Sequence, residues 1–120
     1  MVAILGIGGF FFRAKDPAEL ATWYERHFGI NQVPQDYDAQ AWQQQAGTTV
    51  FAPFDQDSDY FGSPDQTWML NFRVSDLDAA VAELRGHNIT VEVDPDSYPN
   101  GRFARLADPE GNPIQLWQPA

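Results

Sequence analysis

The sequence contains no cysteine, few basic residues and no long apolar run, and each shortage narrows what the chain can do. The lack of cysteine excludes disulfides, thiolate zinc sites and thiol catalysis. Seven Lys and Arg residues stand against 17 Asp and Glu, a formal net charge of -10. This balance disfavours nucleic acids and anionic membranes as partners, because binding phosphates requires clustered cations. No run approaches the ~18 apolar residues of a membrane span and no signal segment is evident, so we expect a cytoplasmic protein.

What the chain does contain is enough apolar material for one folded domain. Its 120 residues are 43% hydrophobic and 14% aromatic, a composition that excludes a disordered chain. A chain of this length buries roughly two thirds of its unfolded surface. Its acidity is compatible with a cationic ligand, although a large net charge more often serves solubility.

The clearest structural pattern runs from Gly101 to Trp117 and predicts a β-hairpin. Residues 108–111, Asp-Pro-Glu-Gly, place Pro at the second turn position, where its fixed φ is favourable, and Gly at the fourth. The flanking runs 103–107 and 113–117 have the alternation and apolar content of half-buried strands.

Two helices are predicted from capping and periodicity. Asp16 precedes Pro17 and apolar residues at helical spacing, which predicts a helix over 16–28 that Gly29 ends. Asp76 begins a second helix over 77–85, ended by Gly86. Strands are predicted over the segments 2–14, 41–46, 48–54, 67–74 and 89–93, in addition to the final hairpin.

The order of elements repeats, which predicts an internal duplication. A shift of sixty residues aligns Phe12-Arg13 with Phe72-Arg73, Asp16 with Asp76, and His27 with His87. We therefore predict two modules, about 1–54 and 67–120, joined by the polar, turn-rich linker 55–66.

The hairpin and the strand-to-helix junctions at Asp16 and Asp76 resemble those of the vicinal-oxygen-chelate superfamily, and the resemblance covers nearly the whole chain. This superfamily includes glyoxalase I, extradiol dioxygenases, fosfomycin-resistance enzymes and bleomycin-resistance proteins. The resemblance implies an α+β fold of paired βαβββ modules, with a curved mixed sheet, helices on its convex face and a cup on its concave face. It also implies a homodimer.

Strand alternation predicts which side chains face this cup. Leu70, Phe72 and Val74 form the apolar set of their strand and should face the helix, and Ile114 and Leu116 should do the same on the last strand. The opposite parity predicts a small-molecule pocket with apolar walls and a few polar groups. Its predicted lining is Phe11, Phe51, Met69, Asn71, Phe103, Arg105, Gln115 and Trp117. The same side chains could instead fill the cup or form a dimer contact.

The remaining charged and titratable residues give no catalytic motif. Arg13 and Arg73 share the parity of the cup and could hold an anion, but we expect them to pair with acids such as Asp108 or Glu110. His27 and His87 fall at predicted helix ends, where the helix dipole favours imidazolium, and a packing role is expected for both.

The resemblance also locates the metal ligands of the family. In its metalloenzymes the ligands lie seven residues before each junction Asp and on the strand that ends each module. Here those positions hold Gly9, Met69, Phe51 and Gln115. A single neutral amide cannot hold a divalent ion against water, so we predict no bound metal and no cofactor.

Three functions fit the sequence. The leading hypothesis is a metal-free, ligand-binding protein that sequesters a small molecule, as bleomycin-resistance proteins do. The alternatives are a metal-dependent enzyme of the glyoxalase or dioxygenase kind and a non-catalytic scaffold with a filled cup. Whether the chain is an enzyme stays open, as does the charge of its ligand.

Overall fold

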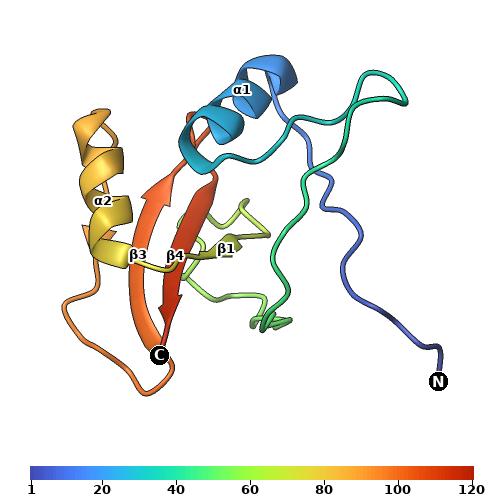
Figure 1. The fold of residues 1–120 in the computed structure, drawn as a ribbon. Coiled ribbons are helices and arrows are strands. Elements are labelled where there is room, and N and C mark those ends of the chain that lie inside the picture. Colours follow the sequence, from blue (N-terminus) through green and yellow to red (C-terminus); the bar gives the residue numbers. More distant parts are fainter.

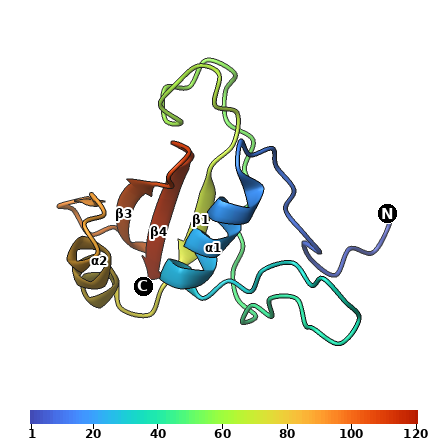
Figure 2. The same ribbon diagram turned by 90° about the horizontal axis from the view of Figure 1, so that it is seen from above.

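The computed structural model describes all of residues 1–120 and has two layers, a sheet of four strands and two helices on one of its faces (Figures 1 and 2). It confirms the predicted fold class, an α+β chain with a curved mixed sheet covered by helices on one side. The elements are α1 (Pro17–Phe28), β1 (Leu70–Arg73), α2 (Leu77–Gly86), β2 (Glu92–Val93), β3 (Gly101–Ala107) and β4 (Pro113–Pro119).

Helix α1 begins and ends as predicted. The Asp16 carboxylate accepts a hydrogen bond from the Glu19 amide at 3.1 Å, and Pro17 occupies the first turn, where its missing N–H costs nothing. Gly29 ends the helix in the left-handed conformation, at φ 67°, and its N–H donates to the Glu25 carbonyl.

Helix α2 begins as predicted but ends one residue later. The Asp76 side chain accepts from the Ala79 amide at 3.0 Å. Gly86 is the last helical residue rather than the one that ends the helix, and the left-handed residue that follows is Asn88, at φ 62°. Asparagine tolerates this conformation better than most side chains, so the glycine is not needed there.

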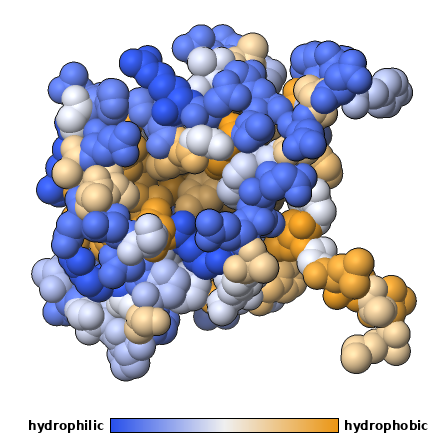
Figure 3. Space-filling view, viewed as in Figure 1, coloured by the Kyte–Doolittle hydropathy of each residue, from blue (hydrophilic) through white to orange (hydrophobic).

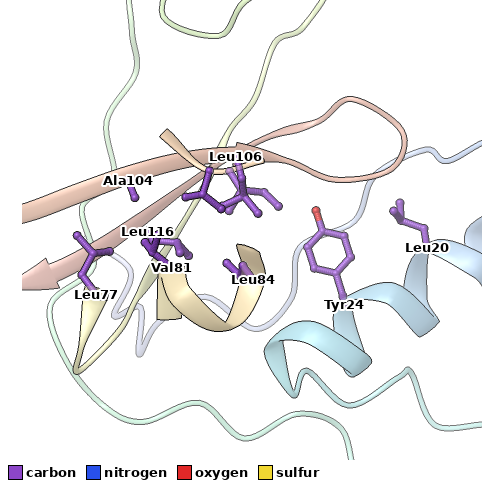
Figure 4. Packing of buried hydrophobic residues seen from close by; sticks show 10 residues of the cluster. Leu20, Tyr24, Leu77, Val81, Leu84, Ala104, Leu106 and Leu116 are labelled. Carbon is purple, nitrogen blue, oxygen red and sulfur yellow. The ribbon is translucent and has the colours of Figure 1, made fainter. Parts of the chain in front are cut away.

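The sheet has the order β1-β4-β3-β2, in which β1 runs parallel to β4 and the other pairs are antiparallel. The core lies between the sheet and the helices (Figure 4). Ile114 and Leu116 of β4 are buried against α2, and Phe72 of β1 lies 5.4 Å from Phe28 of α1, ring centroid to ring centroid. These contacts confirm the predicted helix-facing parity of both strands.

The turn of the β3–β4 hairpin is fastened to α1 by a buried carboxylate. Asp108 is 4% exposed and accepts hydrogen bonds from the Glu110 and Asn112 amides, from the Asn112 side chain and from the Tyr24 hydroxyl, the last at 2.7 Å. Burial of the phenol, together with this hydrogen bond to Asp108, raises the pKa of Tyr24 far above its usual range. The Glu110 carboxylate accepts from the backbone amides of Lys15 and Asp16, at 2.7 and 3.1 Å.

The strands predicted in the first half, over 2–14, 41–46 and 48–54, do not form in the single chain. These segments are extended, no backbone-to-backbone hydrogen bond involves them, and they are exposed almost throughout. A strand needs a neighbour for its amides and carbonyls, and these segments have none within the chain. The sheet therefore has four strands rather than the eight of two paired βαβββ modules, and β2 covers only two residues of the predicted 89–93. The division into two modules stays a prediction.

Large apolar side chains are exposed mainly in this first half. Of the 15 that are exposed, 14 precede residue 55, and Tyr98 is the exception. Figure 3 shows apolar colour both in a hollow at the centre of the view and on the projecting N-terminal segment. Water contact over so many aromatic and aliphatic groups is unfavourable, and the single chain concentrates that contact in its first half.

Candidate ligand-binding face

The face of the sheet opposite the helices carries most of the predicted site residues in two adjacent rows. Asn71, Gln115 and Arg105 are register partners across β1, β4 and β3, and Arg73, Trp117 and Phe103 form the next row. Met69 precedes β1, with its sulfur 3.8 Å from the Arg105 guanidinium. We call these seven residues the cup face: Met69, Asn71, Arg73, Phe103, Arg105, Gln115 and Trp117.

A chain of amide hydrogen bonds crosses the first row. The Asn71 side-chain amide donates to the Gln115 oxygen at 2.6 Å, and the Gln115 nitrogen donates to the Tyr60 hydroxyl, also at 2.6 Å. Gln115 is thus engaged at both ends, by a neighbouring strand and by the linker.

Tyr60 is the residue of this site that the sequence analysis missed. Its ring lies under the Arg105 guanidinium, 4.4 Å from the guanidinium carbon to the ring centroid, and its carbonyl accepts from Arg105 Nη2 at 2.6 Å. The Phe54 ring stacks against it at 5.8 Å. The available signal was the pair Tyr60-Phe61, two aromatic residues in an otherwise polar linker.

The second row forms an aromatic platform. The Phe103 and Trp117 rings lie parallel within 6°, with centroids 6.3 Å apart, and Tyr98 meets Phe103 edge-on. Trp117 is 8% exposed and its indole N–H donates to the Asn100 carbonyl at 2.8 Å. Gly101 makes this fit possible, since a Cβ there would lie 2.8 Å from the indole nitrogen and closer still to the Gln118 carbonyl oxygen. Phe103 is therefore the more accessible ring of the pair.

Phe11 and Phe51 are not brought to the cup face. They are 94% and 86% exposed, on the extended segments that have no strand partner in the single chain. Their predicted inward direction depended on strand pairing that the chain alone does not provide.

The expected ion pairs of the arginines are also absent. Asp108 and Glu110 are occupied by Tyr24 and by backbone amides, whereas Arg73 donates to the Gln45 carbonyl at 2.8 Å. The structure contains one ion pair, between Arg102 and Asp78 at 3.0 Å. Arg105 therefore has no carboxylate partner.

The two histidines lie together on the helix side, away from the cup face. The His27 and His87 rings are 5.2 Å apart. Burial and the neighbouring His87 and Arg26 lower the pKa of His27, so its imidazolium is disfavoured here despite the position at the helix end. The position of His27 against Trp23 and His87 agrees with the packing role that we expected.

An open cavity of about 600 Å³ lies at the turn end of the hairpin. It is bounded by Arg105 and Pro113 on one side and by the linker residues Phe61 and Gln66 on the other. The cavity thus adjoins the cup face at Arg105 rather than at the aromatic platform.

Comparison with known proteins identifies the class to which this fold and face belong. A sequence model of the glyoxalase-like domain matches residues 9–117, and the chain belongs to this family, within the vicinal-oxygen-chelate superfamily. TnmS3, an antibiotic binding protein from Streptomyces sp. CB03234, is 27% identical over 100% of both chains, with a TM-score of 0.66. A protein assigned to the glyoxalase family from Bacillus anthracis is 20% identical over 86% of this chain and 84% of its own, with a TM-score of 0.55, and supports the fold alone.

A curated relative matches only part of the chain. The uncharacterized protein YaeR of Escherichia coli is 46% identical over 52 residues, which are 41% of this chain and 39% of YaeR. Neither helix is long and apolar enough to cross a membrane. The cytoplasmic location stays a prediction.

The residues at the metal positions of the family do not fit a divalent ion. No three His, Asp or Glu side chains converge anywhere in the structure. Gln115, the one possible donor among the four positions, already bonds Asn71 and Tyr60, and the Arg105 guanidinium beside it would repel a cation.

Proposed function

We propose that this protein binds a small organic molecule on the cup face and sequesters it, without a metal-dependent reaction. The observation that carries the proposal is the adjacency of two rows, one with amide and guanidinium donors and one with parallel aromatic rings. Apolar and aromatic walls with a few fixed polar groups are the usual make-up of a small-molecule site. The full-length similarity to an antibiotic binding protein supports the same function.

The chemistry of the face favours binding over catalysis. Its seven residues include no His, Asp or Glu, and Glu92, which pairs with Arg105 in register, lies at the sheet edge. The proposal therefore assigns no acid–base step and no metal ligation to these seven residues. A metal-dependent glyoxalase or dioxygenase reaction would need donors that these positions do not supply.

We also propose that the protein is a homodimer in which the second copy supplies the missing strand partners. The outer edge of β1 is unpaired, and residues 1–14 and 40–54 are extended with exposed apolar side chains. A two-fold arrangement satisfies both features at once, because each copy offers the same edge and the same segments. In such a dimer Phe11 and Phe51 are available to line the cup.

A ligand screen tests the binding function. Thermal unfolding is followed with cationic glycopeptides, aromatic dyes and small aromatic carboxylates, and every hit is repeated on Phe103→Ala. A stabilising ligand whose effect is lost in the variant supports binding at the cup face. If no class stabilises the protein, or if Phe103→Ala leaves every hit unchanged, the proposal fails.

A further inference from the structure

The centre of the cup face is occupied by a side chain from the linker. Tyr60 approaches from residues 55–66 and makes three kinds of contact there. Its hydroxyl accepts from Gln115, its ring lies 4.4 Å below the Arg105 guanidinium, and its carbonyl accepts from Arg105. A phenol on this face thus satisfies the amide donor and the cationic group together.

The linker is fastened to the strands by hydrogen bonds at this one residue. Its remaining hydrogen bonds are local, such as Ser58 N–H to the Asp55 carbonyl and Gly62 N–H to the Asp59 carbonyl. Removal of the Tyr60 side chain would therefore leave the linker with one hydrogen bond to the strands, from Arg105 to the Tyr60 backbone carbonyl, and would break no hydrogen bond between strands.

Arg105 has binding capacity that Tyr60 does not use. A guanidinium has five N–H donors, and besides the Tyr60 carbonyl the only other acceptor it reaches is the weak Met69 sulfur. It has no carboxylate partner, and the cavity of about 600 Å³ opens beside it. An oxygen with partial or full negative charge is the partner that these donors favour.

We propose that Tyr60 stands in for the ligand: the cup face takes a planar hydroxyaromatic molecule, and Tyr60 leaves its place when that molecule binds. The ligand oxygen then accepts from Gln115, and its ring stacks against Arg105 where the tyrosine ring had been. This inference rests on the proposed binding function and adds the ligand class and an internal competitor. Tyr60 must leave the face before the ligand can bind. The apparent affinity for the ligand is therefore the intrinsic affinity multiplied by the fraction of molecules in which Tyr60 is released.

The test uses a matched pair of fluorescent probes, 7-hydroxycoumarin and 7-methoxycoumarin, on the full chain. Binding is measured by fluorescence anisotropy for the wild type, Tyr60→Ala, Tyr60→Phe, Gln115→Leu and the control Tyr37→Ala, whose residue is fully exposed. We expect Tyr60→Ala to bind the hydroxy probe roughly threefold to tenfold more tightly than the wild type, the range that one hydrogen bond corresponds to. Tyr60→Phe should show a smaller gain. Gln115→Leu should lose the preference for the hydroxy probe over the methoxy probe.

The outcomes separate this inference from the function on which it rests. Weaker or unchanged binding by Tyr60→Ala, with thermal unfolding like that of the control, would overturn the inference, since Tyr60 would then be part of the wall or irrelevant. Equal binding of the two probes would overturn the hydroxyaromatic class. If compounds of the wider screen bind at the face but neither coumarin does, the inference fails and the proposed function stands. If nothing binds to the wild type or to Tyr60→Ala, both fail.

Discussion

The two halves of the chain start from similar sequence patterns and reach different structures. Residues 67–120 form a hydrogen-bonded sheet with a helix packed on it, whereas residues 1–54 form one helix and two extended, exposed segments. The final hairpin has its partner strand directly across a tight turn, but the early segments have no partner in the same chain. A strand-forming pattern therefore shows that a segment can form a strand, and the availability of a neighbouring strand decides whether it does.

The largest effect should come from the carboxylate that links the two halves. In Asp108→Ala, the Tyr24 hydroxyl and the Asn112 groups lose their acceptor in a buried site, and we expect a loss of about 4 kcal/mol in the free energy of unfolding. Urea denaturation followed by tryptophan fluorescence measures it, with the exposed Asp57→Ala as control. A loss below about 1 kcal/mol would mean that apolar contacts and the Glu110 hydrogen bonds hold the hairpin and α1 together without Asp108.

Removal of an apolar side chain that the first half exposes should weaken the proposed dimer. Burial of one phenylalanine is worth about 1.5–3 kcal/mol, and a two-fold interface contains each residue twice. We expect Phe51→Ser to weaken dimerisation by about 3 kcal/mol, more than a hundredfold in the dissociation constant. Sedimentation velocity over a concentration series provides the measurement.

Thr90→Ser is a suitable control, because this exposed residue belongs to the second half. A wild-type protein that is monomeric at all concentrations would show that the exposed segments have no partner in a second copy.

Substitutions of the two rings of the aromatic platform should have different effects, one on ligand binding and the other on stability. Phe103→Ala removes the more accessible ring and should weaken a planar ligand by ~1–3 kcal/mol while the fold persists. Trp117→Ala removes a buried ring and should mainly lower the free energy of unfolding. Ligand titration combined with urea denaturation on both variants distinguishes them, and equal effects of the two substitutions in both assays would contradict the assignment.

The smallest effect concerns the histidine pair. Because the pKa of His27 is lowered in the folded state, the unfolded chain binds the proton more readily, so stability should fall as pH falls below about 6.5. The His27→Gln variant should lose this part of the pH dependence and keep the rest. Thermal unfolding between pH 5 and 8 detects the change, and identical slopes for both proteins would contradict it.

Local chemistry made both helices and the hairpin predictable. Asp16, Pro17 and Gly29 specify the ends of α1 through their own hydrogen bonds and dihedral angles, and the residues of the turn at 108–111 do the same for the hairpin. The direction of side chains on β1 and β4 followed from alternation, which placed Asn71 beside Gln115 correctly.

Contacts between segments far apart in the chain could not be predicted from the sequence. Arg73 was expected to meet an acid, but Asp108 and Glu110 were already engaged by Tyr24 and by backbone amides, which no periodicity reveals. Tyr60 was overlooked because a polar, turn-rich linker resembles a solvated loop until its position over the sheet is known.

The attachment of α1 to the hairpin has a consequence for the order in which the chain folds. Tyr24 is bonded to a residue 84 positions later, and Asp16 to one 94 positions later, so α1 cannot dock until nearly the whole chain is available. Contacts of such long range are slow to form, because the loop between their ends must first close. During synthesis α1 leaves the ribosome early, but its hydrogen bonds to the hairpin can form only after the last twenty or so residues have been made. Pulsed hydrogen exchange during refolding should accordingly protect α2, β3 and β4 before α1.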